Sequence, residues 1–200
     1  MEPNESTTEL EAAVGEFVGV ARRAAELGLQ SGTGGNLSLR LGSRVLIKAS
    51  GCSLYGLAES GIVLLSGDGE VLSGPGRPSK ETALHLGLYR SRPDVGGIVH
   101  YHAPFATAFA VRGIPIPRVT IQAKRCFPRM PVVPELPDGS RELADAVIEA
   151  LRDQEVRLVL LTGHGLVAVG ATLAEAHLLA ETAEETAKTA LLARLLSDAT

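Results

Sequence analysis

Cysteine, long apolar runs and blocks of basic residues are all scarce in this chain of 200 residues. The two cysteines, Cys52 and Cys126, form no CxxC motif, which argues against a thiolate zinc site and favours two reduced, partly buried thiols. No apolar run approaches about 18 residues, so we expect no membrane span. The net charge is -4 and no run of five basic residues occurs, which argues against nucleic acid or an anionic membrane as the main partner. The polar, acidic N-terminus lacks the features of a signal peptide, and we expect a cytoplasmic protein.

The composition is otherwise that of a globular protein, with 45% apolar and 21% charged residues, and the length fits a single domain over 1–200. Helical spacing of apolar residues predicts helices over about 7–29, 79–90, 140–151 and 172–195. Short apolar runs predict strands over 37–40, 44–48, 61–65, 95–101, 157–161 and 166–169, and we expect extended connections over 113–139. Strands and helices do not alternate regularly, so we predict an α/β domain with a mostly antiparallel sheet covered by helices.

Three histidines follow predicted strands. His100 and His102 form an HxH pair, and residues i and i+2 of a strand point to the same face, so both imidazoles can converge on one ion. His164 lies between two glycines, which allow a tight turn that presents its ring. Taken alone, the pair could equally be one solvent-facing and one hydrogen-bonded histidine. Since catalytic zinc often takes three protein ligands, the three histidines together predict a zinc site.

Glu81 begins a predicted helix for which Ser79 is the expected cap. A carboxylate there can simply favour the helix dipole, but beside a metal it could be a fourth ligand or a proton shuttle. We expect His85 and His177 to be surface or packing residues rather than ligands.

Small, polar residues at three element ends could together hold one phosphate. The glycine-rich loop over 32–36 offers backbone N–H groups, although it matches neither a nucleotide P-loop nor a dinucleotide-binding motif, and a simple turn is the alternative. The candidate phosphate-binding residues are Gly35, Asn36, Ser50, Gly51, Ser79 and Lys80.

In order along the chain, these motifs resemble the class II aldolase/adducin family. The matching segments are GTGGNLSLR (32–40), ASG (49–51), GRPSKETALH (76–85), RPDVGGIVHYHAPFATA (92–108), GSREL (139–143) and LTGHGLVAVG (161–170). The interval from Glu81 to His100 is 100 − 81 = 19 residues, which also matches the family's aldolases.

The resemblance implies a C4 homotetramer with active sites at subunit interfaces and one zinc ion per subunit. The metal would be bound by His100, His102, His164 and Glu81, and Glu81 would leave it to act as acid/base. The phosphate-binding positions of the family fall on the six residues named above. The implied reaction is retro-aldol cleavage of a ketose 1-phosphate, such as L-fuculose 1-phosphate, to dihydroxyacetone phosphate and an aldehyde.

Some residues depart from the aldolase pattern and leave alternatives open. Lys80 replaces a serine, and decarboxylases of the family that act on 3-oxo-tetronate 4-phosphates share this Ser-Lys-Glu sequence. Val119 or Thr120 lies where an aldolase has a tyrosine near the aldehyde, and the chain ends soon after its last helix, so a second such tyrosine is expected to be absent. A sugar-phosphate dehydratase or epimerase, an adducin-like non-catalytic interaction module, and manganese or cobalt in place of zinc are further alternatives.

Overall fold

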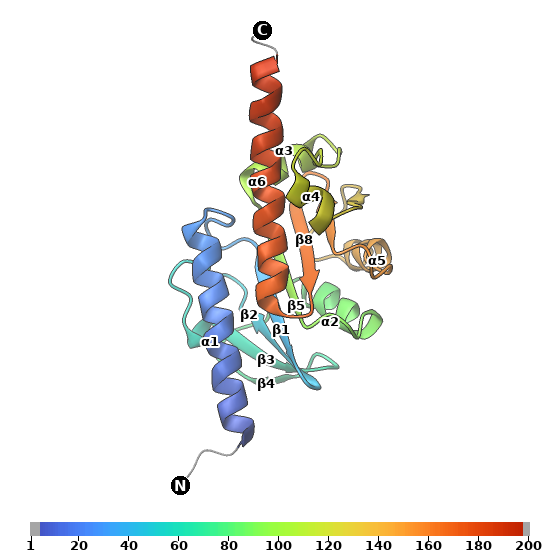
Figure 1. Cartoon of the computed structure of the whole chain (residues 1–200). Coiled ribbons are helices and arrows are strands. Elements are labelled where there is room, and N and C mark those ends of the chain that lie inside the picture. Colours follow the sequence, from blue (N-terminus) through green and yellow to red (C-terminus); the bar gives the residue numbers. More distant parts are fainter. Residues whose placement is uncertain (1–4, 198–200) are drawn as a thin grey trace.

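A single eight-stranded sheet runs through the computed structural model, which describes residues 5–197 (Figure 1). Its spatial order is β4-β3-β2-β1-β5-β8-β7-β6, and every neighbouring pair is antiparallel except β6 and β7. The strands are β1 (Asn36–Leu41), β2 (Arg44–Lys48), β3 (Ile62–Ser66), β4 (Val71–Ser73), β5 (Gly97–Tyr101), β6 (Val132–Val133), β7 (Leu158–Leu161) and β8 (Gly165–Gly170).

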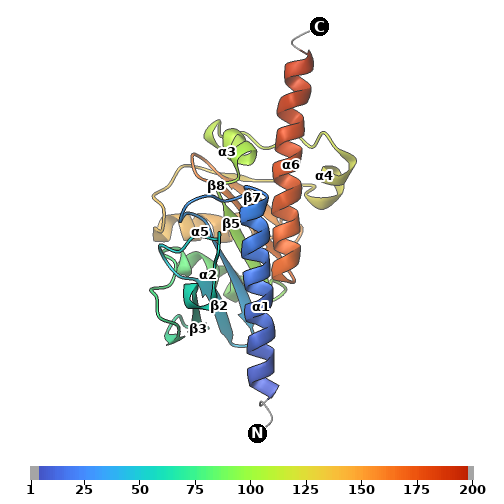
Figure 2. The same ribbon diagram turned by 90° about the vertical axis from the view of Figure 1, so that its left-hand side faces the viewer.

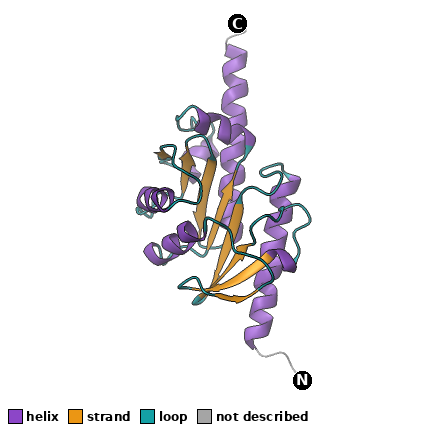
Figure 3. Cartoon of the chain, turned by 180° about the vertical axis from the view of Figure 1, so that it is seen from behind, coloured by secondary structure: helices purple, strands orange, loops and turns teal. Residues whose placement is uncertain are grey.

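Helices cover both faces of this sheet. The α-helices are α1 (Glu5–Glu26), α2 (Thr82–Ser91), α3 (Pro104–Val111), α4 (Ile121–Cys126), α5 (Arg141–Ala150) and α6 (Leu173–Ser197), with one 3-10 turn at Glu59–Gly61. The long helices α1 and α6 lie side by side on one face, together with α3 and α4 (Figure 2). The shorter helices α2 and α5 pack on the opposite face, as the view from behind shows (Figure 3).

Strand alternation divides the core into two layers. On β5, Val99 and Tyr101 belong to the cluster beneath α1 and α6, whereas Ile98 belongs to the cluster beneath α2 and α5. Since neighbouring side chains on a strand point to opposite faces, His100 lies on the α2 side. The metal-ligand candidates therefore face the layer that carries Glu81.

The expected fold class is confirmed: the chain is α/β, with a mostly antiparallel sheet covered by helices. Three details differ from the sequence predictions, and one of them is the strand β4, which was not predicted. The residue at the N-cap of α2 is Glu81 instead of Ser79, and the region 113–139 contains α4 and β6 in addition to extended chain. No helix within residues 5–197 is long and apolar enough to cross a membrane. The single domain over 1–200 stays a prediction, since residues 1–4 and 198–200 lie outside the described part.

Candidate metal centre

The register of the sheet brings distant segments together at one end of its central strands. Asn36 at the start of β1 is the Cα partner of His100 near the end of β5, because these strands are antiparallel. On the other side of β5, Tyr101 pairs with Leu166 at the start of β8, so the turn that carries His164 lies at the same end of these strands. His102 follows the last residue of β5, and the N-terminus of α2 supplies Glu81.

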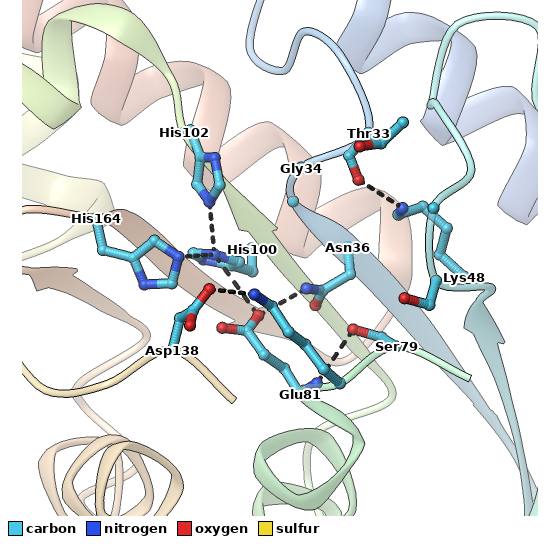
Figure 4. A pocket seen from close by; sticks show the side chains of 14 residues that line it. Thr33, Gly34, Asn36, Lys48, Ser79, Glu81, His100, His102, Asp138 and His164 are labelled. Carbon is cyan, nitrogen blue, oxygen red and sulfur yellow. Dashed lines mark hydrogen bonds and ion pairs between the residues drawn. The ribbon is translucent and has the colours of Figure 1, made fainter. Parts of the chain in front are cut away.

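The three imidazoles point toward one another (Figure 4). Nε2 of His100 lies 3.1 Å from Nε2 of His102 and 3.2 Å from Nε2 of His164. His100 Nδ1 lies 2.9 Å from the carbonyl oxygen of Leu166, which can only accept a hydrogen bond. Nδ1 therefore carries the proton, and Nε2 is left with a free lone pair.

This arrangement fits a metal ion. Zinc–nitrogen bonds of about 2.0–2.1 Å in a tetrahedral site separate the ligand nitrogens by roughly 3.3 Å, close to the spacing around His100. Without an ion, lone pairs of neutral imidazoles would face each other at this distance. The three histidines offer ligand atoms that all lie within 4.8 Å of one another. They could therefore hold a divalent ion.

Glu81 lies against this cluster and is 3% exposed. Its Oε2 accepts a hydrogen bond of 2.6 Å from Asn36 Nδ2 and lies 3.6 Å from His100 Nε2. Its Oε1 is buried and has no hydrogen-bond partner among the described residues. A buried carboxylate oxygen without a partner is costly, which fits a position that a metal ion, a substrate or a proton would fill.

Burial and charge together keep the site in the protonation state that a metal needs. Burial raises the pKa of Glu81, but His100, the hydrogen bond from Asn36, and the other histidines outweigh it and lower this pKa to about 2. Burial, followed by the neighbouring histidine His100, lowers the pKa of His102 to about 4 and also lowers that of His164. At neutral pH the carboxylate is ionised and these two imidazoles are neutral, as metal ligands must be.

All six candidate phosphate-binding residues line the pocket that contains the metal cluster: Gly35, Asn36, Ser50, Gly51, Ser79 and Lys80. Gly35 has a φ of +58°, and a Cβ at this position would lie 2.3 Å from Gln30 Oε1 and 2.8 Å from the carbonyl oxygen of His100. Only glycine therefore allows the loop to approach the metal strand so closely.

Three of these side chains already have partners. The NH₂ group of Asn36 donates to Glu81, and the hydroxyl of Ser79 accepts a hydrogen bond of 3.2 Å from the backbone N–H of Glu81. The ammonium of Lys80 pairs with the carboxylate of Asp138, and both side chains are more than half exposed at the pocket. An exposed pair of this kind is weak, so Lys80 can exchange this partner for a substrate anion.

The sequence predictions missed several residues that shape the site. Lys48 is 2% exposed, and its ammonium donates to the carbonyls of Cys52 at 2.6 Å and Thr33 at 3.2 Å, so it ties two pocket loops together. A lysine within an apolar strand, two residues before Ser50, was a signal for this role. Asp138 carried no such signal, because its contact with Lys80 depends on tertiary structure.

The histidines that we expected to be surface or packing residues are both buried and hydrogen-bonded. His85 is fully buried between Asn36 and Ser38, with Nε2 2.5 Å from Asn36 Oδ1. His177 is 4% exposed and bonds to the hydroxyl of Tyr101 on the opposite face of the sheet. Neither belongs to the metal cluster, as expected. The free cysteines are half-buried, which also agrees with the prediction.

Comparison with known proteins agrees with this geometry. The class II aldolase and adducin N-terminal domain model matches residues 15–191. A 5-deoxy-D-ribulose 1-phosphate aldolase from Bacillus thuringiensis serovar kurstaki is 36% identical over 171 residues, covering 84% of this chain and 79% of that protein. An L-fuculose phosphate aldolase from Escherichia coli O6:H1 is 36% identical over 173 residues, covering 86% and 79%. The crystal structure of L-fuculose-1-phosphate aldolase from Thermus thermophilus has a TM-score of 0.85 at 30% identity and covers 96% of this chain and 98% of that one.

The family model matches most of the chain, and three histidines that could hold a metal ion lie together at one end of the central strands. The chain therefore belongs to the class II aldolase and adducin N-terminal domain family, and it is an aldolase of that family.

Proposed function

We propose that this protein is a zinc-dependent lyase that cleaves a ketose 1-phosphate to dihydroxyacetone phosphate and an aldehyde. One observation carries the proposal: a single pocket contains three converging imidazoles, a buried carboxylate and three loops suited to an anion. Two similar aldolases are named for sugar phosphates, one for 5-deoxy-D-ribulose 1-phosphate and one for L-fuculose phosphate, which supports the same substrate class.

Each group in the pocket has a role in this reaction. His100, His102, His164 and Glu81 would hold the zinc ion, one per subunit, which supplies Lewis acidity toward the carbonyl and hydroxyl oxygens of the ketose. In the cleavage direction, the C3–C4 bond breaks, the C4 hydroxyl loses its proton as the aldehyde forms, and C3 gains a proton. Glu81 would move the proton at C3, because its Oε1 has no other partner.

The phosphate would be held at the other side of the pocket. The backbone N–H groups of Gly35 and Gly51 and the hydroxyls of Ser50 and Ser79 are suited to phosphate oxygens, and Asn36 lies beside them in the same pocket. Lys80 would contribute a positive charge after leaving Asp138. Holding the phosphate fixes the distance from C1 to the reacting carbons, so the acid/base group meets the same atom in every turnover.

We also propose that the active site is completed by another subunit of a C4 homotetramer. The pocket holds only about 100 Å³, whereas sites for small molecules commonly hold about 300–1,000 Å³. The chain carries an apolar surface around the end of α6, where Val119, Ile121, Leu192, Leu195 and Leu196 are each at least 48% exposed. A contiguous patch of such side chains would be typical of a subunit interface. Light scattering of the purified protein tests the assembly, since a monomer would contradict it.

A decarboxylase for a 3-oxo-tetronate 4-phosphate is the second candidate, favoured by Lys80. Its ammonium lies at the pocket rim directly after Ser79, paired with Asp138, where it could meet a substrate carboxylate. This chemistry would release carbon dioxide instead of an aldehyde.

The test is a substrate panel with the zinc-loaded protein: L-fuculose 1-phosphate, 5-deoxy-D-ribulose 1-phosphate, a ketopentose 5-phosphate and a 3-oxo-tetronate 4-phosphate. We expect dihydroxyacetone phosphate from the 1-phosphates and no product from the 5-phosphate. Glu81→Gln serves as the inactive control. Carbon dioxide from the tetronate, without cleavage of either 1-phosphate, would refute the aldolase proposal in favour of the decarboxylase.

A further inference from the structure

A chain of buried polar groups leads away from Glu81 into the layer between the sheet and α2. Asn36 lies between Glu81 and His85, with distances of 2.6 Å to Glu81 Oε2 and 2.5 Å to His85 Nε2. Behind it, His85 Nδ1 lies 2.6 Å from the hydroxyl of Ser38, which lies 2.8 Å from the hydroxyl of Tyr89. Five side chains from β1 and from the N-cap and body of α2 are thus linked in series.

The chemistry of the end group fixes the direction of every hydrogen bond. An ionised carboxylate can only accept, so Asn36 must present its NH₂ group to Glu81 and its carbonyl to His85. His85 must then carry its proton on Nε2, which leaves Nδ1 to accept from Ser38. The Ser38 oxygen then accepts a hydrogen bond from the hydroxyl of Tyr89. The donor and the acceptor of each link are thus fixed, so the linked side chains have a single arrangement of hydrogen bonds.

The far end of the chain is anchored as well. The guanidinium of Arg40 lies 4.6 Å from the centre of the Tyr89 ring and donates to the Tyr89 carbonyl at 2.5 Å. Every linked side chain is at most 7% exposed, from Ser38 and His85 at 0% to Tyr89 at 7%. Water therefore does not compete for these hydrogen bonds.

The structure shows what the chain leaves free. Of the two carboxylate oxygens of Glu81, Oε2 is held by Asn36 while Oε1 is buried without a partner among residues 5–197. The hydrogen bond of a packing histidine can end on a neighbouring side chain, as that of His177 Nδ1 does on the Tyr101 hydroxyl on the other face. His85 differs because its hydrogen bond ends, through one amide, on the carboxylate beside the metal cluster (Figure 4 shows this last link).

We propose that His85 is a positioning residue, which, with Ser38 and Tyr89 behind it, locks the amide of Asn36 and thereby directs Oε1 of Glu81 into the site. Without the donor on His85 Nε2, the Asn36 carbonyl loses its partner, and the amide is no longer fixed in the plane that directs its NH₂ group at the carboxylate. The hydrogen bond from Asn36 to Glu81 would then weaken, and Glu81 would adopt several orientations. The inference rests on the proposed function in taking Glu81 as both metal ligand and acid/base.

Two substitutions of the same residue separate positioning from packing. His85→Gln can keep an N–H donor near the position of Nε2, whereas His85→Leu removes it and retains an apolar side chain of similar volume. His177→Leu is the control, since it also removes a buried, hydrogen-bonded histidine, but on the opposite sheet face. Ser38→Ala is a smaller change that removes only the donor to Nδ1 and keeps the test open should His85→Leu fail to fold.

The measurements are kcat and KM for ketose 1-phosphate cleavage, and Co²⁺ affinity with the visible absorption spectrum of the bound Co²⁺. Loss of a partner behind a metal ligand lowers activity or metal affinity by about 10–100-fold. We expect His85→Leu to lower kcat by this factor, to leave KM within about twofold and to weaken Co²⁺ binding with a changed spectrum. His85→Gln should restore most of each value, Ser38→Ala should give a smaller loss in the same direction, and His177→Leu should match the wild type.

The Co²⁺ measurements separate failure of this inference from failure of the proposed function. Wild-type kinetics and Co²⁺ spectra in a folded His85→Leu or Ser38→Ala would overturn the positioning role, even if the ketose 1-phosphate is cleaved. If the wild type cleaves none of the sugars, the proposed reaction is wrong. The positioning role would then stand or fall on whether His85→Leu, but not His85→Gln, changes Co²⁺ affinity and spectrum.

Discussion

Substitution of Gly35 by alanine tests how the glycine-rich loop is joined to the metal strand. Gly35 has a φ of +58°, and an added Cβ would lie 2.3 Å from Gln30 Oε1 and 2.8 Å from the carbonyl oxygen of His100. Gln30 Oε1 in turn accepts a 2.8 Å hydrogen bond from the backbone N–H of His102. The new methyl group therefore pushes on both strand residues that carry the metal ligands.

The magnitude follows from four contributions. The left-handed backbone conformation costs alanine about 1–2 kcal/mol, and the more restricted unfolded chain offsets about 0.4–1 kcal/mol of this. Overpacking at a site with no free space costs about 1–3 kcal/mol, and loss of the Gln30–His102 hydrogen bond costs about 1 kcal/mol. Gly35→Ala should therefore lower the free energy of unfolding by about 3–5 kcal/mol, a large part of the 5–15 kcal/mol typical of a folded protein.

Gly32→Ala is the matched control, because Gly32 has a φ of +62° in the same loop but no atom within 4 Å of an added Cβ. It should lower stability by only about 1 kcal/mol. Urea denaturation of the metal-free proteins, followed by circular dichroism, measures both values. Equal losses for Gly35→Ala and Gly32→Ala would refute the close approach between this loop and the metal strand.

Other predictions concern the ligands, a buried arginine and pH. His164→Ala should abolish stoichiometric zinc binding, measured by elemental analysis after dialysis, because two imidazoles and one carboxylate remain. Arg92→Met should cost about 3–5 kcal/mol in urea denaturation, because the guanidinium is 2% exposed and donates to three main-chain carbonyls, which would lose this donor, as well as to Asp94. Burial lowers the pKa of His85 from 6.5 to about 4. Between pH 4 and 6.5 the unfolded, metal-free protein therefore binds a proton at His85 that the folded protein does not. His85 should therefore contribute a loss of stability of about 3 kcal/mol as the pH drops from 6.5 to 4. His85→Gln should remove that part of the slope, and an unchanged slope would contradict it.

The fold class and the clustering of the three histidines were predictable because local patterns carry them. Apolar periodicity gave the helices and strands, and an HxH pair with a glycine-flanked histidine indicated a shared ion before any tertiary contact was known. The helix α4 was missed because the segment around it is rich in proline and basic residues, and its cap at Thr120, which accepts from Ala123, is a short-range signal that composition hides.

The supporting groups were not predictable, because they depend on register and on helix placement. Nothing local to Asn36 indicates that its amide would bond to Glu81, 45 residues away; the antiparallel pairing of β1 with β5 and the position of α2 bring them together. His85 did carry a local signal, since residues i and i+4 of a helix share one face. That signal does not reveal which group the ring meets across the sheet.

Metal-dependent cleavage by one preparation of the protein tests the central claim most directly. Zinc content and dihydroxyacetone phosphate release from ketose 1-phosphates are measured for the purified protein, after chelation, and after zinc is restored. The account predicts one divalent ion per chain, loss of cleavage with the ion and its return with zinc. It further predicts that Glu81→Gln remains folded but does not turn over. Cleavage that persists after complete removal of the metal, or an active protein with no divalent ion at stoichiometric occupancy, would contradict it.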